Sequence, residues 1–189
     1  MANDGVDNAP IAAEPTPPHG LRHIASRAID WILPEKNPTG AVYGTMIVGA
    51  VLATESAGRE TLVETVTAVA LALGLYWLAH AYAATLGQRL DNQTPLSTAA
   101  LRRALVRDFA IVRGAIAPIL ALLIAAAAGA SLATAVLAAV WTSAVLIVTF
   151  EVVAATRAQM RGRELIVQVC VGAIMGLAII ALRVVMHWH

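Results

Sequence analysis

One helical turn of the sequence carries three side chains that could take part in chemistry. Tyr76 lies four residues before His80 and Trp77 lies three before it, so an α-helix would place all three on one face. A histidine titrates near neutral pH, so His80 could carry a proton or contact a ligand. The structural alternative is a neutral His80, hydrogen-bonded to a neighbouring helix and flanked by aromatic rings. Tyr82 follows in the same segment and is the fourth candidate.

Arg113 and Glu151 form a second candidate set, because each is an ionisable residue near one end of an apolar segment. Counted from the turn near Ala130, they lie 17 and 21 positions away, which is a difference of about 6 Å in depth. A charged group in mid-membrane costs about 2.5–3.5 kcal/mol, so pairing is favoured. We therefore expect an Arg113–Glu151 ion pair, with a transport site as the alternative. Glu64 and Arg183 could pair likewise at the opposite end.

Motifs of enzymes and metal proteins are missing from the sequence. It contains no HExxH, GxSxG, P-loop or CxxC pattern. Cys170 is the single cysteine and is interpreted as a small buried hydrophobic residue. His187 and His189 lack further ligands of fixed spacing, so we assign no metal site. We expect no catalytic residue, no cofactor and no metal, and we do not expect an enzyme.

The composition indicates a membrane protein. Of 189 residues, 59% are apolar and 13% are charged, and the mean hydropathy is +0.72. Soluble domains are about 45–50% apolar and about 25% charged. The apolar residues also fall into blocks that the charged residues separate. The expected fold class is therefore all-α, a polytopic membrane helix bundle.

Five apolar blocks predict five transmembrane helices. They cover residues 39–57, 61–86, 110–129, 132–153 and 165–186. A spanning helix needs about 20 residues, and the block at 61–86 meets this requirement best, whereas the first block reaches it only by including small residues up to Gly58. The turn at Gly129-Ala130-Ser131 is so short that the third and fourth spans must be antiparallel neighbours.

Two glycine pairs predict close contacts between helices. Gly40 and Gly44 lie in the first span, and Gly172 and Gly176 lie in the fifth. Small residues at this spacing let two helix backbones approach closely in a membrane. Both pairs are helix-packing candidates.

The chain before the first span is expected to contain two parts. Residues 1–18 are rich in proline and poor in apolar residues, which predicts a disordered cytoplasmic tail. Residues 19–36 predict an amphipathic interfacial helix that stops at Pro34. The alternative is that its apolar face docks on the protein's own helices or on a partner. A further surface helix is expected in the loop 87–108, beginning at Thr94-Pro95 or at Ser97.

The basic residues predict the orientation. With five spans, eleven of the 13 basic residues lie on the side of the N-terminus. The positive-inside rule then places the N-terminus in the cytoplasm and the C-terminus outside the plasma membrane. Four arginines of the loop 87–108 are Arg89, Arg102, Arg103 and Arg107. They are interpreted as topology determinants and lipid contacts, and no nucleic acid partner is expected.

Two short segments resemble a known group of proteins. Tyr43-Gly44-Thr45 reads YGT, and the seven residues from Trp77 to Ala83 read WLAHAYA. In both, the chain resembles small, uncharacterised integral membrane proteins of Actinobacteria that carry YGT and WLAHxYA segments. The resemblance covers the first two spans. It implies a membrane location and an actinobacterial source, and it implies no activity.

Two functions are consistent with these features. The first is a non-enzymatic accessory or scaffold subunit that binds membrane lipid and a larger membrane complex or a second copy of the chain, through its two GxxxG faces and its N-terminal helix. The second is a small transporter or channel with His80 on the pathway and with Arg113 and Glu151 lining a cytoplasmic vestibule. We expect the first. The feature that separates them is whether His80 faces a polar cavity or a packed helix interface.

Overall fold

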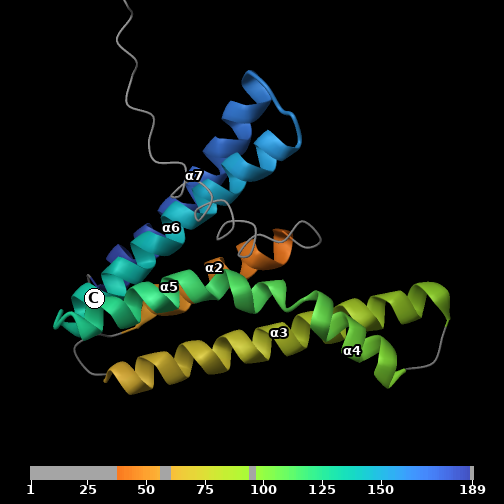
Figure 1. Ribbon diagram of the computed structural model, residues 1–189, viewed down its shortest axis with the longest axis horizontal. Coiled ribbons are helices and arrows are strands. Elements are labelled where there is room, and N and C mark those ends of the chain that lie inside the picture. Colours follow the sequence, from red (N-terminus) through yellow and green to blue (C-terminus); the bar gives the residue numbers. More distant parts are fainter. Residues whose placement is uncertain (1–37, 56–60, 94–96, 188–189) are drawn as a thin grey trace, which may run out of the picture.

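The computed structural model describes residues 38–55, 61–93 and 97–187, and for residue 187 only its backbone. All regular structure in these ranges is helical (Figure 1). The helices are α2 (Pro38–Thr54), α3 (Leu62–Asn92), α4 (Thr98–Arg107), α5 (Ala110–Ala127), α6 (Leu132–Arg157) and α7 (Arg163–His187). The predicted all-α membrane bundle is confirmed. The predicted tail 1–18 and interfacial helix 19–36 lie outside the described residues.

Four helical stretches of the described chain are long and apolar enough to cross a membrane. They are α3, α6, α7 and the near-continuous stretch that α4 and α5 form together. The fifth apolar helix, α2, has 17 residues. At 1.5 Å per residue it is about 26 Å long, which is the lower end of the spanning range of about 17–25 residues. α3 differs most from its predicted bounds, because it continues to Asn92 instead of ending at Leu86.

α2 lies at the centre of the bundle, where it contacts α3, α5, α6 and α7. Eight of its residues are buried: Gly40, Ala41, Gly44, Thr45, Val48, Gly49, Leu52 and Ala53. Most of them are small, so α2 presents little side-chain bulk on several sides, and neighbouring helices can reach its backbone.

The crossing of α2 and α5 is the closest contact of this kind. A Cβ added to Gly44 would overlap the carbonyl oxygen of Ile111, and a Cβ added to Gly114 would overlap the carbonyl oxygen of Ala41. The hydroxyl of Thr45 lies 2.8 Å from the carbonyl oxygen of Gly114 and 3.0 Å from that of Ala41. Each helix therefore supplies a glycine where the other helix's backbone passes.

The α6–α7 pair uses the second glycine motif in the same way. A Cβ on Gly176 would lie 3.1 Å from the carbonyl oxygen of Ala144, and one on Gly172 would meet the side chain of Glu151. Both glycines are buried. This face of α7 is thus occupied by α6 of the same chain.

The short connection between α5 and α6 makes them neighbours, as expected. Gly129 has a φ of +84°, the left-handed conformation that glycine adopts with little strain. Around it, the amide of Ala130 donates to the carbonyl of Ala125 over 3.1 Å, which closes the end of α5. The Ser131 hydroxyl then accepts from the amide of Thr134 and caps the start of α6.

α3 lies along one edge of the bundle, and the α6–α7 hairpin diverges from the α3–α5 side (Figure 1). With 31 residues, α3 is the longest of the described helices, yet its buried residues are few: Thr65, Val69, Leu73, Ala81 and Thr85. Its start is closed by a capping box, in which Glu64 accepts from the Thr61 amide over 2.7 Å and the Thr61 hydroxyl accepts from the Glu64 amide over 3.3 Å.

Candidate functional site

Two of the candidate side chains, Tyr76 and His80, belong to a cluster of three rings between α2 and α3. Tyr76 stacks on His80 with ring centroids 5.9 Å apart, as their spacing on α3 requires. Tyr43 of α2 completes the cluster, with its ring centroid 6.2 Å from Tyr76 and 5.9 Å from His80. The segments YGT and WLAHAYA, which are distant in sequence, therefore come together in space.

His80 sits in this aromatic contact between α2 and α3, and its side chain is half-buried. One cavity is lined by Tyr43, and His80 is not among the described residues that line it. Tyr82, by contrast, is 54% exposed and points away from the cluster's helix interface. The two tyrosines on α3 thus have different surroundings, because Tyr76 shares the face of His80 and Tyr82 does not.

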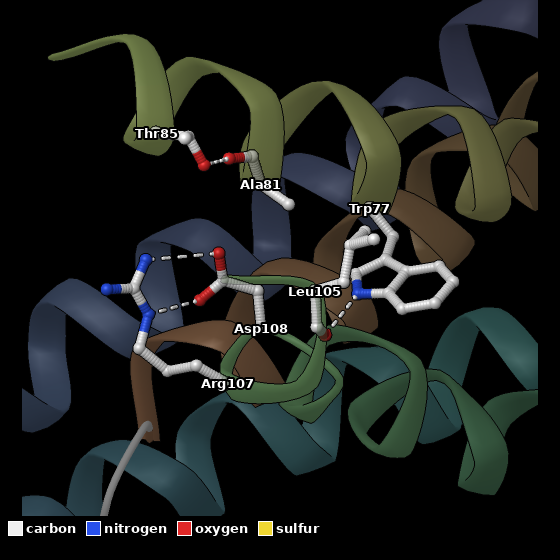
Figure 2. A network of polar contacts seen from close by, with 6 residues as sticks. All are labelled: Trp77, Ala81, Thr85, Leu105, Arg107 and Asp108. Carbon is white, nitrogen blue, oxygen red and sulfur yellow. Dashed lines mark hydrogen bonds and ion pairs between the residues drawn. The ribbon is translucent and has the colours of Figure 1, made fainter. Parts of the chain in front are cut away.

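Trp77 fastens α4 to α3. Its indole N–H donates to the carbonyl oxygen of Leu105 over 3.1 Å (Figure 2). Its ring also meets Phe109 edge to face, with centroids 5.9 Å apart. The predicted surface helix after Ser97 therefore exists as α4, and it folds back along α3.

A buried carboxylate lies at the joint of α4 and α5. Asp108 is 1% exposed, and both its oxygens accept from Arg107, from Nε over 2.9 Å and from Nη2 over 3.3 Å (Figure 2). A bidentate guanidinium is the partner that a buried carboxylate needs. The sequence reasoning missed Asp108. The signal for it was an acidic residue directly after a helix rich in arginine.

The predicted ion pair between Arg113 and Glu151 is not what these side chains form in the described part of the chain. Glu151 accepts a hydrogen bond from the Gln168 amide of α7. Arg113 lies over the ring of Phe109, 5.8 Å from its centroid. The two residues line different cavities, because α6 turns Glu151 toward α7 whereas α5 turns Arg113 toward α3 and α4. Depth alone could not reveal this, since it says nothing about helix rotation.

The expected pairing of Glu64 with Arg183 is also wrong. Glu64 takes part in the capping box of its own helix. Arg183 is 7% exposed, and its Nη1 donates to the carbonyl oxygens of Leu52 and Glu55, over 3.2 and 2.7 Å. These carbonyls belong to the end of α2, where the last turn lacks internal donors. A cation there also complements the negative end of the helix dipole.

Two cavities have candidate residues in their walls. The first, of about 420 Å³, lies between α2, α6 and α7 and is lined by Pro38, Thr39, Val42, Tyr43, Met46, Phe150, Glu151, Ala154, Gln168, Val171 and Met175. The second, of about 360 Å³, lies between α3, α4 and α5 and is lined by Trp77, Arg102, Leu105, Val106, Phe109 and Arg113. One thus carries a carboxylate and the other carries two guanidinium groups.

No group of three histidine, cysteine, aspartate or glutamate side chains in the described ranges could hold a metal ion. Cys170, expected to be buried, is exposed on α7.

Comparisons with protein family models, with curated proteins and with solved structures gave no match to this chain.

Proposed function

We propose that the chain is a non-enzymatic accessory or scaffold subunit, inserted in the plasma membrane by five helices, that binds a spanning helix of a larger membrane protein. The contact surface is the outer face of α3, defined here by Thr67, Leu71, Gly74, Leu75, Leu78 and Tyr82. Five of these side chains are exposed. They recur at helical spacing and so form one continuous stripe.

The open space beside Gly74 on α3 is the observation that carries this proposal. A Cβ added to it would meet nothing within 4 Å, so none of the described helices explains the missing side chain. Glycine in the middle of a helix costs about 0.5–1 kcal/mol relative to alanine. In membrane helices such a position is typical of a surface where a second helix approaches.

The two GxxxG pairs are not free to form the partner surface that was expected of them. Gly44 is covered by α5, and Gly172 and Gly176 are covered by α6. Binding through the outer face of α3 leaves these internal contacts intact. It also suits the position of α3 at the edge of the bundle (Figure 1).

The polar side chains favour a structural protein over a catalyst. Thr45 bonds to α5, Trp77 bonds to α4, and Arg183 bonds to the end of α2. Each of these contacts joins two helices. A bundle that uses its intramembrane polar groups in this way gains a fixed shape, which a docking subunit requires.

The orientation with a cytoplasmic N-terminus needs α2 to span. Two contacts support this, because they lie at opposite ends of α2. Tyr43 near the start of α2 contacts His80. The carbonyl of Leu52 near its end accepts a hydrogen bond from Arg183, which is close to the end of α7. An alkaline phosphatase fused to the C-terminus is expected to be active, and a green fluorescent protein fused there is expected to be dark. The reverse pattern would contradict the orientation.

The test of the partner surface is purification of the tagged full chain from its own membranes in mild detergent. The expected result is a stoichiometric larger membrane protein that is lost with Gly74→Leu and retained with Gly87→Leu. Gly87 is a matched control, because its added Cβ also meets nothing within 4 Å on the same helix. A partner retained by both variants, or a chain that purifies alone or only with a second copy of itself, would contradict the proposal.

A small transporter or channel is the second candidate. It is favoured by Tyr43, which touches His80 and also lines the cavity that contains Glu151. A proton could in that case pass between the cavity and the imidazole. Ion flux in proteoliposomes that falls with His80→Ala would support it, and flux that equals that of empty vesicles would exclude it.

A further inference from the structure

We propose that the cavity between α3, α4 and α5 binds the headgroup of an anionic phospholipid. The inference rests only on the membrane location of the proposed function and not on a partner at the outer face of α3. Of the residues on that face, none lines this cavity. The two proposals can therefore fail separately.

The charge of the cavity is the first argument. Arg102 of α4 and Arg113 of α5 come from different helices and line the same space of about 360 Å³. Among the described residues that line this cavity, these two carry a charge, and both are cations. The nearby carboxylate of Asp108 is engaged by Arg107 and does not line the cavity. Guanidinium groups bind phosphate oxygens through paired, charge-assisted hydrogen bonds.

The remaining walls are apolar, which separates a lipid from a soluble anion. Trp77, Leu105, Val106 and Phe109 line the space beside the two arginines. Val106 is 71% exposed and Phe109 is 40% exposed. Exposed apolar side chains next to cations are typical of a helix at the membrane surface. A phospholipid offers both a phosphate for the arginines and an apolar acyl region for these walls, whereas free phosphate would make no favourable contact with the apolar side chains.

The depth of the cavity fits the headgroup level. α5 has 18 residues and a length of about 27 Å, close to the hydrocarbon thickness of about 30 Å. Arg113 lies in the first turn of α5, and Phe109 directly precedes that helix. Trp77 is also a residue type that concentrates at the membrane interface. The cavity therefore lies where the hydrocarbon ends and the phosphates begin.

The walls are held in place without a ligand. The hydrogen bond from Trp77 to the Leu105 carbonyl fixes the indole and joins α3 to α4. The edge-to-face contact with Phe109 extends the fixed surface to the start of α5. A preformed site loses less conformational entropy on binding.

The test uses the full chain in detergent, titrated with phosphatidylglycerol or phosphatidylcholine and followed by native mass spectrometry. We expect one phosphatidylglycerol to bind more tightly than phosphatidylcholine. Arg102→Gln is expected to weaken phosphatidylglycerol binding about tenfold, the effect of losing one charge-assisted hydrogen bond. Arg113→Gln is expected to act in the same direction.

Arg103→Gln is the matched control. Arg103 is the next residue on α4, its Nε donates to the Ala99 carbonyl over 3.2 Å, and it does not line the cavity. Its substitution should leave the affinity unchanged. Equal losses with Arg102→Gln and Arg103→Gln would overturn the proposal, since they would mean diffuse attraction. Equal binding of the two lipids would overturn it as well. Displacement of the lipid by equimolar inorganic phosphate would instead identify a soluble-anion site.

Discussion

α2 and α3 are both apolar helices, but they have opposite places in the molecule. α2 has 17 residues and contacts α3, α5, α6 and α7, and most of its small residues are buried. α3 has 31 residues and lies at the edge, where most of its large apolar side chains are exposed. Hydropathy and length make α3 the more conspicuous segment. Residue size makes α2 the helix around which the others pack, because a close contact between two backbones requires glycine or alanine. In lipid, an exposed leucine carries no free-energy penalty, so α3 can remain at the edge.

The largest expected difference between the two helices comes from one substitution made in each. Gly44→Ala places a methyl group against the backbone of Ile111 and is expected to destabilise the bundle by about 3 kcal/mol. Gly74→Ala on α3 meets nothing and is expected to stabilise by about 0.5–1 kcal/mol. Thermal unfolding in detergent measures both. Equal melting temperatures would contradict the central position of α2.

The next effect concerns the end of α2. Arg183→Gln removes the guanidinium that donates to the carbonyl oxygens of Leu52 and Glu55. We expect the free energy of unfolding to fall by about 2 kcal/mol. The control is Arg161→Gln, because Arg161 is an exposed residue between α6 and α7. Unfolding of both variants in the same detergent provides the comparison. A loss as large for Arg161→Gln would show that total charge matters and the cap does not.

A smaller difference is expected between two threonines. Thr45→Val removes the hydroxyl that reaches across from α2 to Gly114 on α5, at a cost of about 1 kcal/mol. Thr67→Val on α3 removes a hydroxyl that bonds only to Val63 within its own helix, and a change near zero is expected. Unfolding midpoints of the two variants test whether the interhelical bond stabilises. A midpoint for Thr45→Val that matches the wild type would show that it does not.

The smallest expected effect is at the contact between α2 and α3. His80→Phe keeps a ring beside Tyr43 and Tyr76, so the unfolding free energy should change by less than about 0.5 kcal/mol. Tyr82→Phe, on the exposed side of α3, is the control. If His80→Phe is clearly destabilising whereas Tyr82→Phe is not, the imidazole makes a specific polar contact and the aromatic packing is not its main role.

The candidate site was predictable in part. The spacing of Tyr76 and His80 on one face followed from helix geometry, and the structure shows the two rings stacked. Tyr43 entered the cluster from another helix, so no local pattern could indicate it. The partners of Arg113 and Glu151 were mistaken, because counting residues gives the depth along a helix and leaves its rotation and its neighbours open.

The sequence by itself determined the local features of this protein. Blocks of apolar residues specify membrane helices, since every backbone polar group in lipid must be satisfied within its own segment. Ser131 and Gly129 specify the boundaries of α5 and α6, through a side-chain cap and a left-handed turn. Such signals act over a few residues, so they can be read without knowing the fold.

Only the tertiary structure decided which surfaces meet. The glycines of α7 face α6 and Gly44 faces α5, whereas Gly74 faces none of the described helices of this chain. All four are glycines in apolar helices. The GxxxG spacing marks three of them as packing positions, but it does not tell which helix each of them meets. Arg183 likewise became the cap of α2 because the end of α2 lies beside α7. Contacts of this kind depend on how all the helices pack together, which is a property of the whole chain.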